Sequence, residues 1–158
     1  MIRIEQSTTI QKEPREVFDF LANVANLPKW QAGTVKSELI TAPPLATGSR
    51  FIEVVRLGPW KLDTTCVVTE LKMPEVFAFE AMSKPIDYAG SFRLSPEAGG
   101  TRVSLRAVAH LKGLWRLMEP VLAGDLRKES RTELENLRRL IEEGEPQPSV
   151  QSSMAGEA

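Results

Sequence analysis

Six segments in the middle of this chain alternate between apolar and polar residues, and turn-forming glycines and prolines separate them. An alternation with a period of two is typical of β-strands that bury one face. Because the separators are short, consecutive segments are expected to pair as antiparallel hairpins. The predicted strands cover residues 34–41, 49–57, 60–71, 76–83, 88–95 and 101–111. The sequence therefore predicts an antiparallel meander.

Three shorter elements are expected before this meander. Residues 2–10 also alternate, which predicts a first strand and brings the sheet to seven. Pro14 suits the first turn of a short helix, because proline lacks an N–H that this turn does not use. A second short helical or turn element is expected over residues 27–30, after a break at residues 23–26.

A long amphipathic run, from Leu114 to Glu143, closes the pattern. Gly113, Pro120 and Gly124 interrupt its start, so the prediction is a short lead-in helix over 114–119, a bend near Pro120 and a main helix over 121–142. At helical spacing one stripe contains the apolar residues Leu126, Leu134, Leu137 and Ile141, together with Ser130 and Glu133. Ion pairs are expected on the opposite face, namely Arg131/Glu135, Glu135/Arg139 and Arg138/Glu142.

The predicted elements form an α+β fold in which a curved seven-stranded antiparallel sheet wraps around the long helix. A helix is about 10 Å wide, which is too narrow to fill the concave face of such a sheet. A largely apolar cavity is therefore expected between helix and sheet.

Strand parity indicates which side chains face this cavity, except on strand 49–57. There both Phe51/Glu53/Val55 and Ile52/Val54/Arg56 are acceptable inward sets. The candidate ligand-binding residues are Trp30, Leu62, Thr64, Cys66, Phe77, Phe79, Tyr88, Phe92, Leu105, Leu126, Ser130 and Glu133.

Several of these candidates also have a purely structural explanation. Ser130 could bond its own helix backbone, and Glu133 could pair with an arginine at the cavity rim. Tyr88 could donate to a ligand or simply pack with its hydroxyl in water. Trp30 could pack under the short helices, and the only histidine, His110, has the parity of the convex face. No residue is assigned to catalysis.

Composition excludes several classes of function. Lys+Arg number 20 and Asp+Glu 21, so a net charge of −1 gives no bulk attraction to nucleic acid. A single cysteine and a single histidine offer no recognisable metal set, and no phosphate loop is present, so no metal or cofactor is expected. No apolar run is long enough to span a membrane, and the first residues lack the apolar core of a signal peptide. We expect a cytoplasmic monomer or homodimer, with one domain over 1–143 and a disordered tail over 144–158.

Short motifs along the chain resemble the START-like helix-grip superfamily, in particular its polyketide cyclase/dehydrase and lipid-transport-like (SRPBCC) branch. The resemblance spans about residues 3–143. Its motifs are EPREVFDFL (13–21), LPKW (27–30), GGTRVS (99–104), LKG (111–113), EP (119–120) and LRRLIE (137–142). It implies a hydrophobic pocket and leaves the ligand unnamed, because this fold serves several functions.

Three classes of function follow. The preferred hypothesis is a carrier or sensor that binds a lipid, quinone or polyketide-like molecule, because the expected pocket is mostly apolar. The second is a cyclase, dehydratase or hydrolase that acts in the same pocket through Glu133, Tyr88 or Glu53; two titratable groups with shifted pKa values would favour it. The third is a co-chaperone-type module, which an exposed apolar patch would favour.

Overall fold

A computed structural model describes residues 1–57, 59–82 and 86–144 of the chain. The predicted tail, Gly144 apart, lies outside the described residues. Strands and helices follow in the order β1 (Ile2–Ile10), α1 (Pro14–Leu21), η1 (Val24–Asn26), α2 (Leu27–Trp30), β2 (Thr34–Leu39), β3 (Arg50–Leu57), β4 (Trp60–Lys72), β5 (Val76–Met82), β6 (Ile86–Glu97), β7 (Gly100–Leu111), η2 (Gly113–Met118) and α3 (Glu119–Glu143), where η marks a 3₁₀ helix.

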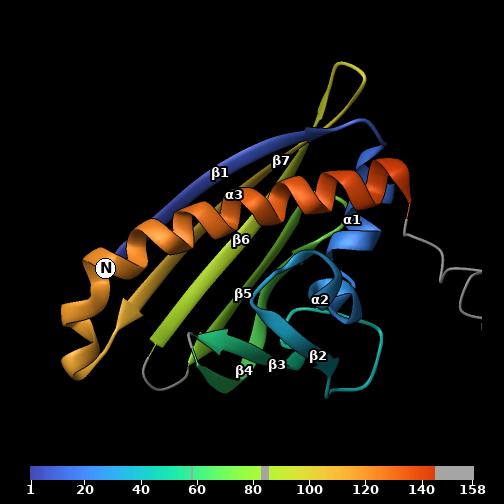
Figure 1. Cartoon of the computed structure of the whole chain (residues 1–158). Coiled ribbons are helices and arrows are strands. Elements are labelled where there is room, and N and C mark those ends of the chain that lie inside the picture. The colour runs from blue at the N-terminus through green and yellow to red at the C-terminus, as the bar shows by residue number, and fades with distance from the viewer. Residues whose placement is uncertain (58, 83–85, 145–158) are drawn as a thin grey trace, which may run out of the picture.

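The strands form one seven-stranded sheet in the order β1-β7-β6-β5-β4-β3-β2, and every neighbouring pair is antiparallel. Helix α3 runs across one face of this curved sheet, and α1 and α2 lie near its C-terminal end (Figure 1). The structure therefore confirms the predicted α+β helix-grip fold. The chain begins beside the start of α3, where the N-terminal ammonium pairs with Glu119.

The start of the long helix differs from the prediction. The lead-in is a 3₁₀ helix over Gly113–Met118, and α3 then begins at Glu119 with Pro120 in its first turn. Proline suits that position, so it marks a helix boundary. The prediction that Gly124 interrupts the helix is wrong, because α3 is continuous through this residue. A single glycine lowers helix stability by about 1 kcal/mol, which packing of the rest of the helix can offset.

The main core lies under the C-terminal half of α3. Helix α3 contributes Leu134, Leu137 and Ile141 to this core, and these side chains are at most 8% exposed. They belong to one apolar cluster with the α1 residues Val17, Phe18 and Leu21 and with the inward side chains of the sheet. A second, smaller cluster packs under the N-terminal half of α3 around Ile2, Ile4, Ala109 and Leu111. The two halves of α3 are thus held unequally.

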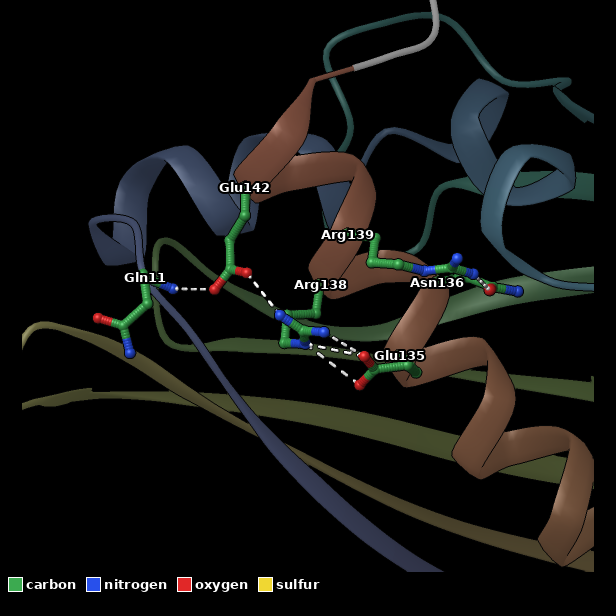
Figure 2. Close-up of polar contacts among 6 residues, drawn as sticks. All are labelled: Gln11, Glu135, Asn136, Arg138, Arg139 and Glu142. Carbon is green, nitrogen blue, oxygen red and sulfur yellow. Dashed lines mark hydrogen bonds and ion pairs between the residues drawn. The ribbon is translucent and has the colours of Figure 1, made fainter.

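Arg138 organises the outer face of α3 (Figure 2). Its guanidinium donates to Glu135 and, at 2.7 Å, to Glu142. Glu142 in turn accepts a hydrogen bond from the backbone N–H of Gln11 at 2.9 Å, which ties the helix end to the end of β1. The predicted pair Arg138/Glu142 is confirmed. The predictions of Arg131/Glu135 and Glu135/Arg139 are wrong, because Glu135 takes Arg138 as its partner and Arg139 donates to Asn136.

Gly100 provides a sharp test of the register between β1 and β7. A Cβ atom at Gly100 would lie 2.1 Å from the carbonyl oxygen of Ile10. Because the obstructing atoms belong to the backbone of Ile10 and cannot turn aside, Gly100→Ala should lower the free energy of unfolding by about 2 kcal/mol or more, as overpacking does. Gly124→Ala is the matched control, since nothing lies within 4 Å of its added Cβ. That variant should gain up to about 1 kcal/mol in stability from helix propensity. Urea denaturation of both variants measures the difference, and equal stabilities would contradict the register.

Candidate functional site

A cavity of about 290 Å³, partly open to solvent, lies between α3 and the concave face of the sheet. The small side chains of Ala107 and Ala109 on β7 leave part of this space empty, whereas Gly90 on β6 makes room for the ring of Phe79, whose Cζ would lie 3.2 Å from an added Cβ. The expectation of a cavity between helix and sheet is therefore confirmed. Nine of the predicted ligand-binding residues line it: Leu62, Thr64, Phe79, Tyr88, Phe92, Leu105, Leu126, Ser130 and Glu133.

Three predicted site residues, Trp30, Cys66 and Phe77, lie in the core beside the cavity and not on its wall. Trp30 is 1% exposed and contacts Phe92 edge-on, with ring centroids 5.8 Å apart. Phe77 packs against Phe79 and Phe92 with centroid distances of 5.6 and 6.5 Å. Strand parity places Cys66 and Phe77 on the inward face but does not give their depth. These two side chains, together with Trp30 from α2, support the wall and do not form it.

Strand β3 places Glu53 on the cavity wall. Phe51 and Glu53 are buried and Ile52 is 37% exposed, which settles the parity that the sequence left open. The inward set is Phe51/Glu53/Val55. Arg56 also borders the cavity, although its side chain is exposed. The sequence names Glu53 as a possible catalytic group but not among the ligand-binding residues, because it leaves the inward parity of this strand open.

The Glu53 carboxyl is only 2% exposed and lacks a full set of partners. The Cys66 thiol lies 3.7 Å from Oε2 and donates a weak hydrogen bond to it. Within the described part of the chain, Oε1 is buried without a hydrogen-bond partner. Burial raises the pKa of Glu53 to about 7, and the Cys66 hydrogen bond offsets this only in part. Burial also raises the pKa of the Cys66 thiol, which therefore stays protonated.

Helix α3 adds a second carboxyl to the same cavity. Burial raises the pKa of Glu133 to about 8, and the neighbouring negative charges of Glu129 and then Glu53 add to the effect. The hypothesis that an arginine pairs with Glu133 is wrong within the described residues, where no ion pair to its carboxyl is found. Ser130 bonds its own helix backbone, as the structural explanation predicts, because its hydroxyl donates to the backbone oxygen of Arg127 at 2.9 Å.

Tyr88, on β6, lines the same cavity as the two carboxyls. Its ring contacts Phe79 edge-on at 5.4 Å, which fixes the direction of the side chain. Burial, and then the negative charge of Glu53, raises the pKa of Tyr88 well above its usual value of 10. The hydroxyl is therefore protonated at neutral pH and can donate a hydrogen bond into the cavity.

Apolar side chains are exposed beside this cavity, on the segment that leads into α3. Leu114 and Leu117 are 84% and 78% exposed, and Val121 is 61% exposed. Trp115, in the same segment, meets Trp60 of β4 edge-on at 5.7 Å. Exposed apolar patches are a feature of interaction surfaces, and this patch is the feature that the co-chaperone hypothesis requires.

The described residues contain neither a helix that could span a membrane nor a cluster of metal-binding side chains. No helix in residues 1–57, 59–82 and 86–144 combines the length and apolar character needed to cross a membrane. In the same described ranges, no three His, Cys, Asp or Glu side chains are grouped so that they could hold a metal ion.

Comparison with known proteins gives a family and a fold. The family model described as polyketide cyclase/dehydrase and lipid transport matches residues 1–142. No curated protein matches the chain. Among solved structures, TTHA0849 from Thermus thermophilus is similar with a TM-score of 0.76 at 16% identity, over 88% of this chain and 96% of that one. A conserved protein from Geobacillus kaustophilus has a TM-score of 0.73 at 18% identity, over 89% and 95% of the two chains.

A third similar structure is the di-domain ARO/CYC BexL from the BE-7585A biosynthetic pathway. Its TM-score is 0.68 at 19% identity, and the match covers 88% of this chain but 46% of that one. Identities this low show a shared fold and leave the activity open.

Proposed function

Since the chain belongs to the polyketide cyclase/dehydrase and lipid transport family, we propose that it binds an apolar small molecule, as a carrier or sensor, in the cavity beneath α3. The cavity itself is the observation that carries this proposal. Of the 23 residues on its described wall, twelve are aromatic or aliphatic, two are glycines and nine carry polar or charged side chains. Ligand sites in proteins commonly have this composition, because apolar contacts supply affinity and isolated polar groups set orientation.

Three polar groups are placed to orient the ligand. The hydroxyl of Tyr88 is a donor, whereas the carboxyls of Glu53 and Glu133 accept when ionised and can also donate when protonated. They come from β6, β3 and α3, so they face the cavity from different sides. A lipid, quinone or polyketide-like ring with oxygen substituents would find both donors and acceptors here.

Filling the cavity tests the proposal directly. Ala107 lines the cavity on β7, whereas its neighbour Val108 is 39% exposed on the other face of the strand. Ala107→Phe should abolish binding of the uncharged fluorophore N-phenylnaphthylamine, because the new ring occupies the space that the probe needs. Val108→Phe adds an aromatic ring at the next position and should leave binding unchanged. Fluorescence titration measures both affinities.

Circular dichroism checks that each variant is folded. Equal binding by the two folded variants, or no binding by the wild type, would contradict the proposal. Native mass spectrometry of protein purified from its own host would then identify the molecule that co-purifies with it.

An enzyme with a cyclase or dehydratase type of reaction is the second candidate. The observation that favours it is the pair of carboxyls, Glu53 and Glu133, whose pKa values lie near neutrality on one cavity. Groups with such pKa values can both accept and release a proton at physiological pH. Retention of ligand binding with loss of turnover in Glu133→Gln would distinguish this candidate from a carrier.

A further inference from the structure

The polar part of the cavity wall is unbalanced in charge. Among the residues that the structure describes, four acidic ones line it, namely Glu53, Asp125, Glu129 and Glu133, against one basic residue, Arg56. The three acids on α3 are spaced four residues apart, so they form a row along one side of the helix. Asp125 and Glu129 are exposed at the mouth, and Glu133 and Glu53 lie deeper. Arg56 is exposed too, so water screens its charge.

Glu53 indicates what is missing from this cavity. It is 2% exposed, and its Oε1 has no hydrogen-bond partner in the described residues. A buried acceptor without a partner costs free energy, and a donor supplied by a ligand would remove that cost. The protonated Tyr88 hydroxyl and Cys66 thiol are neutral, so they can donate hydrogen bonds but cannot balance the charge of the two carboxyls.

We propose that the ligand is an apolar molecule with a protonated amine, and that Glu53 and Glu133 hold the ammonium group while the apolar part packs against Phe79, Phe92 and Leu105. This inference rests on the proposed function, because it specifies the chemistry of the molecule bound in the same cavity. A fatty acid anion would face like charges at the deep end and along the mouth, which is unfavourable at short range. An uncharged alcohol would satisfy one acceptor but gain no charge attraction.

The ionisation of the two carboxyls gives this inference a pH signature. In the empty cavity, the pKa of Glu53 is about 7 and that of Glu133 about 8. Below these values both are neutral and attract an ammonium group weakly, and above them both are charged. The preference for an amine over an alcohol should therefore grow as the pH rises from about 6 to 9, where alkylamines are still protonated because their pKa resembles that of lysine, about 10.4. Asp125, Glu129 and Arg56 line the mouth of the same cavity, where burial and then the negative charge of Asp125 raise the pKa of Glu129.

Displacement of N-phenylnaphthylamine by three molecules with the same chain tests the inference. Decylamine, decanol and decanoate differ only in the head group. At pH 8 decylamine should displace the fluorophore at a concentration about tenfold lower than decanol, which is the size of one charge-assisted hydrogen bond. Decanoate should be the weakest. Glu133→Gln and Glu53→Gln should each reduce the advantage of decylamine, whereas Glu70→Gln, an equal loss of charge at an exposed position of β4, should preserve it.

The displacement measurements distinguish failure of the amine inference from failure of the proposed function. Equal displacement by decylamine and decanol, or an amine advantage that both cavity variants retain, would overturn the inference. So would decanoate as the strongest competitor, although binding of an apolar molecule in the cavity would stand. Absence of fluorophore binding to the wild type would overturn the proposed function itself, and this inference with it. The ratio of decylamine to decanol affinity is compared within each variant, so a general loss of stability does not mimic the expected change.

Discussion

Replacing Leu137 by aspartate should lower the free energy of unfolding by about 4 kcal/mol or more, and much of the protein should be unfolded at 37 °C. Leu137 is 0% exposed and packs in the main core between α3, the short helices and the sheet. The substitution removes a buried aliphatic side chain and places a carboxylate among apolar groups that offer it no partner. Thermal and urea denaturation followed by circular dichroism measure the loss.

Thr132→Asp is the matched control on the same helix. Thr132 is exposed and donates only to the backbone oxygen of Lys128 at 3.1 Å. The same carboxylate is there hydrated, so the free energy of unfolding should change by about 0.5 kcal/mol at most. Similar melting temperatures for the two variants would mean that the assignment of the buried and exposed faces of α3 is wrong.

The second large effect is a loss of stability as the pH rises. Folding raises the pKa of Glu53 from 4.5 to about 7 and that of Glu133 from 4.5 to about 8. Between pH 4.5 and these values, the folded protein keeps protons that the unfolded chain has released. The folded state therefore binds more protons, and its stability falls with increasing pH. Glu53 alone should account for roughly 3 kcal/mol of the decrease between pH 5 and 8.

Glutamine at position 53 separates this effect from the general charge of the protein. Glu53→Gln cannot ionise, so it should remove roughly 3 kcal/mol of the pH dependence and be more stable than the wild type at pH 8. Part of the change will come through Glu133, because the charge of Glu53 raises its pKa. Glu70→Gln should follow the wild-type pH profile. Urea denaturation at several pH values measures the free energy of unfolding of each variant. A wild-type stability that rises from pH 5 to 8 would contradict the ionisation assigned to Glu53 and Glu133.

The fold could be predicted from the sequence because its signals are local. Alternation identifies a half-buried strand, glycine and proline identify its ends, and a stripe of leucines identifies the buried face of α3. These signals fail where two alternatives have the same composition. On strand β3 each parity set contains two apolar residues and one charged residue. The choice depends on tertiary packing, such as the contact of Phe51 with Phe79 at a centroid distance of 5.9 Å.

The site was only partly predictable for a related reason. Parity distinguishes the concave from the convex face, but depth within the concave face depends on curvature. This is why Tyr88 lines the cavity, whereas Cys66, on the same inward side of the sheet, is 0% exposed in the core. The sequence names Glu53 only as a possible catalytic group, because the alternation on its strand leaves the inward parity open. Sequence patterns fail most often at functional sites, where local rules are broken.

The pairing of β1 with β7 determines when this protein can fold during its synthesis. Ile2 lies opposite Ala109 in the sheet, and the N-terminal ammonium of Met1 pairs with Glu119 at the start of α3 (Figure 1). Strand β1 therefore leaves the ribosome long before β7, its neighbour in the described sheet, has been translated. Contacts between such distant parts of a chain form slowly and leave apolar strand edges exposed meanwhile. The cavity needs β7 and then α3 as its cover, so it cannot be completed, and the proposed ligand cannot be bound, before α3 has left the ribosome.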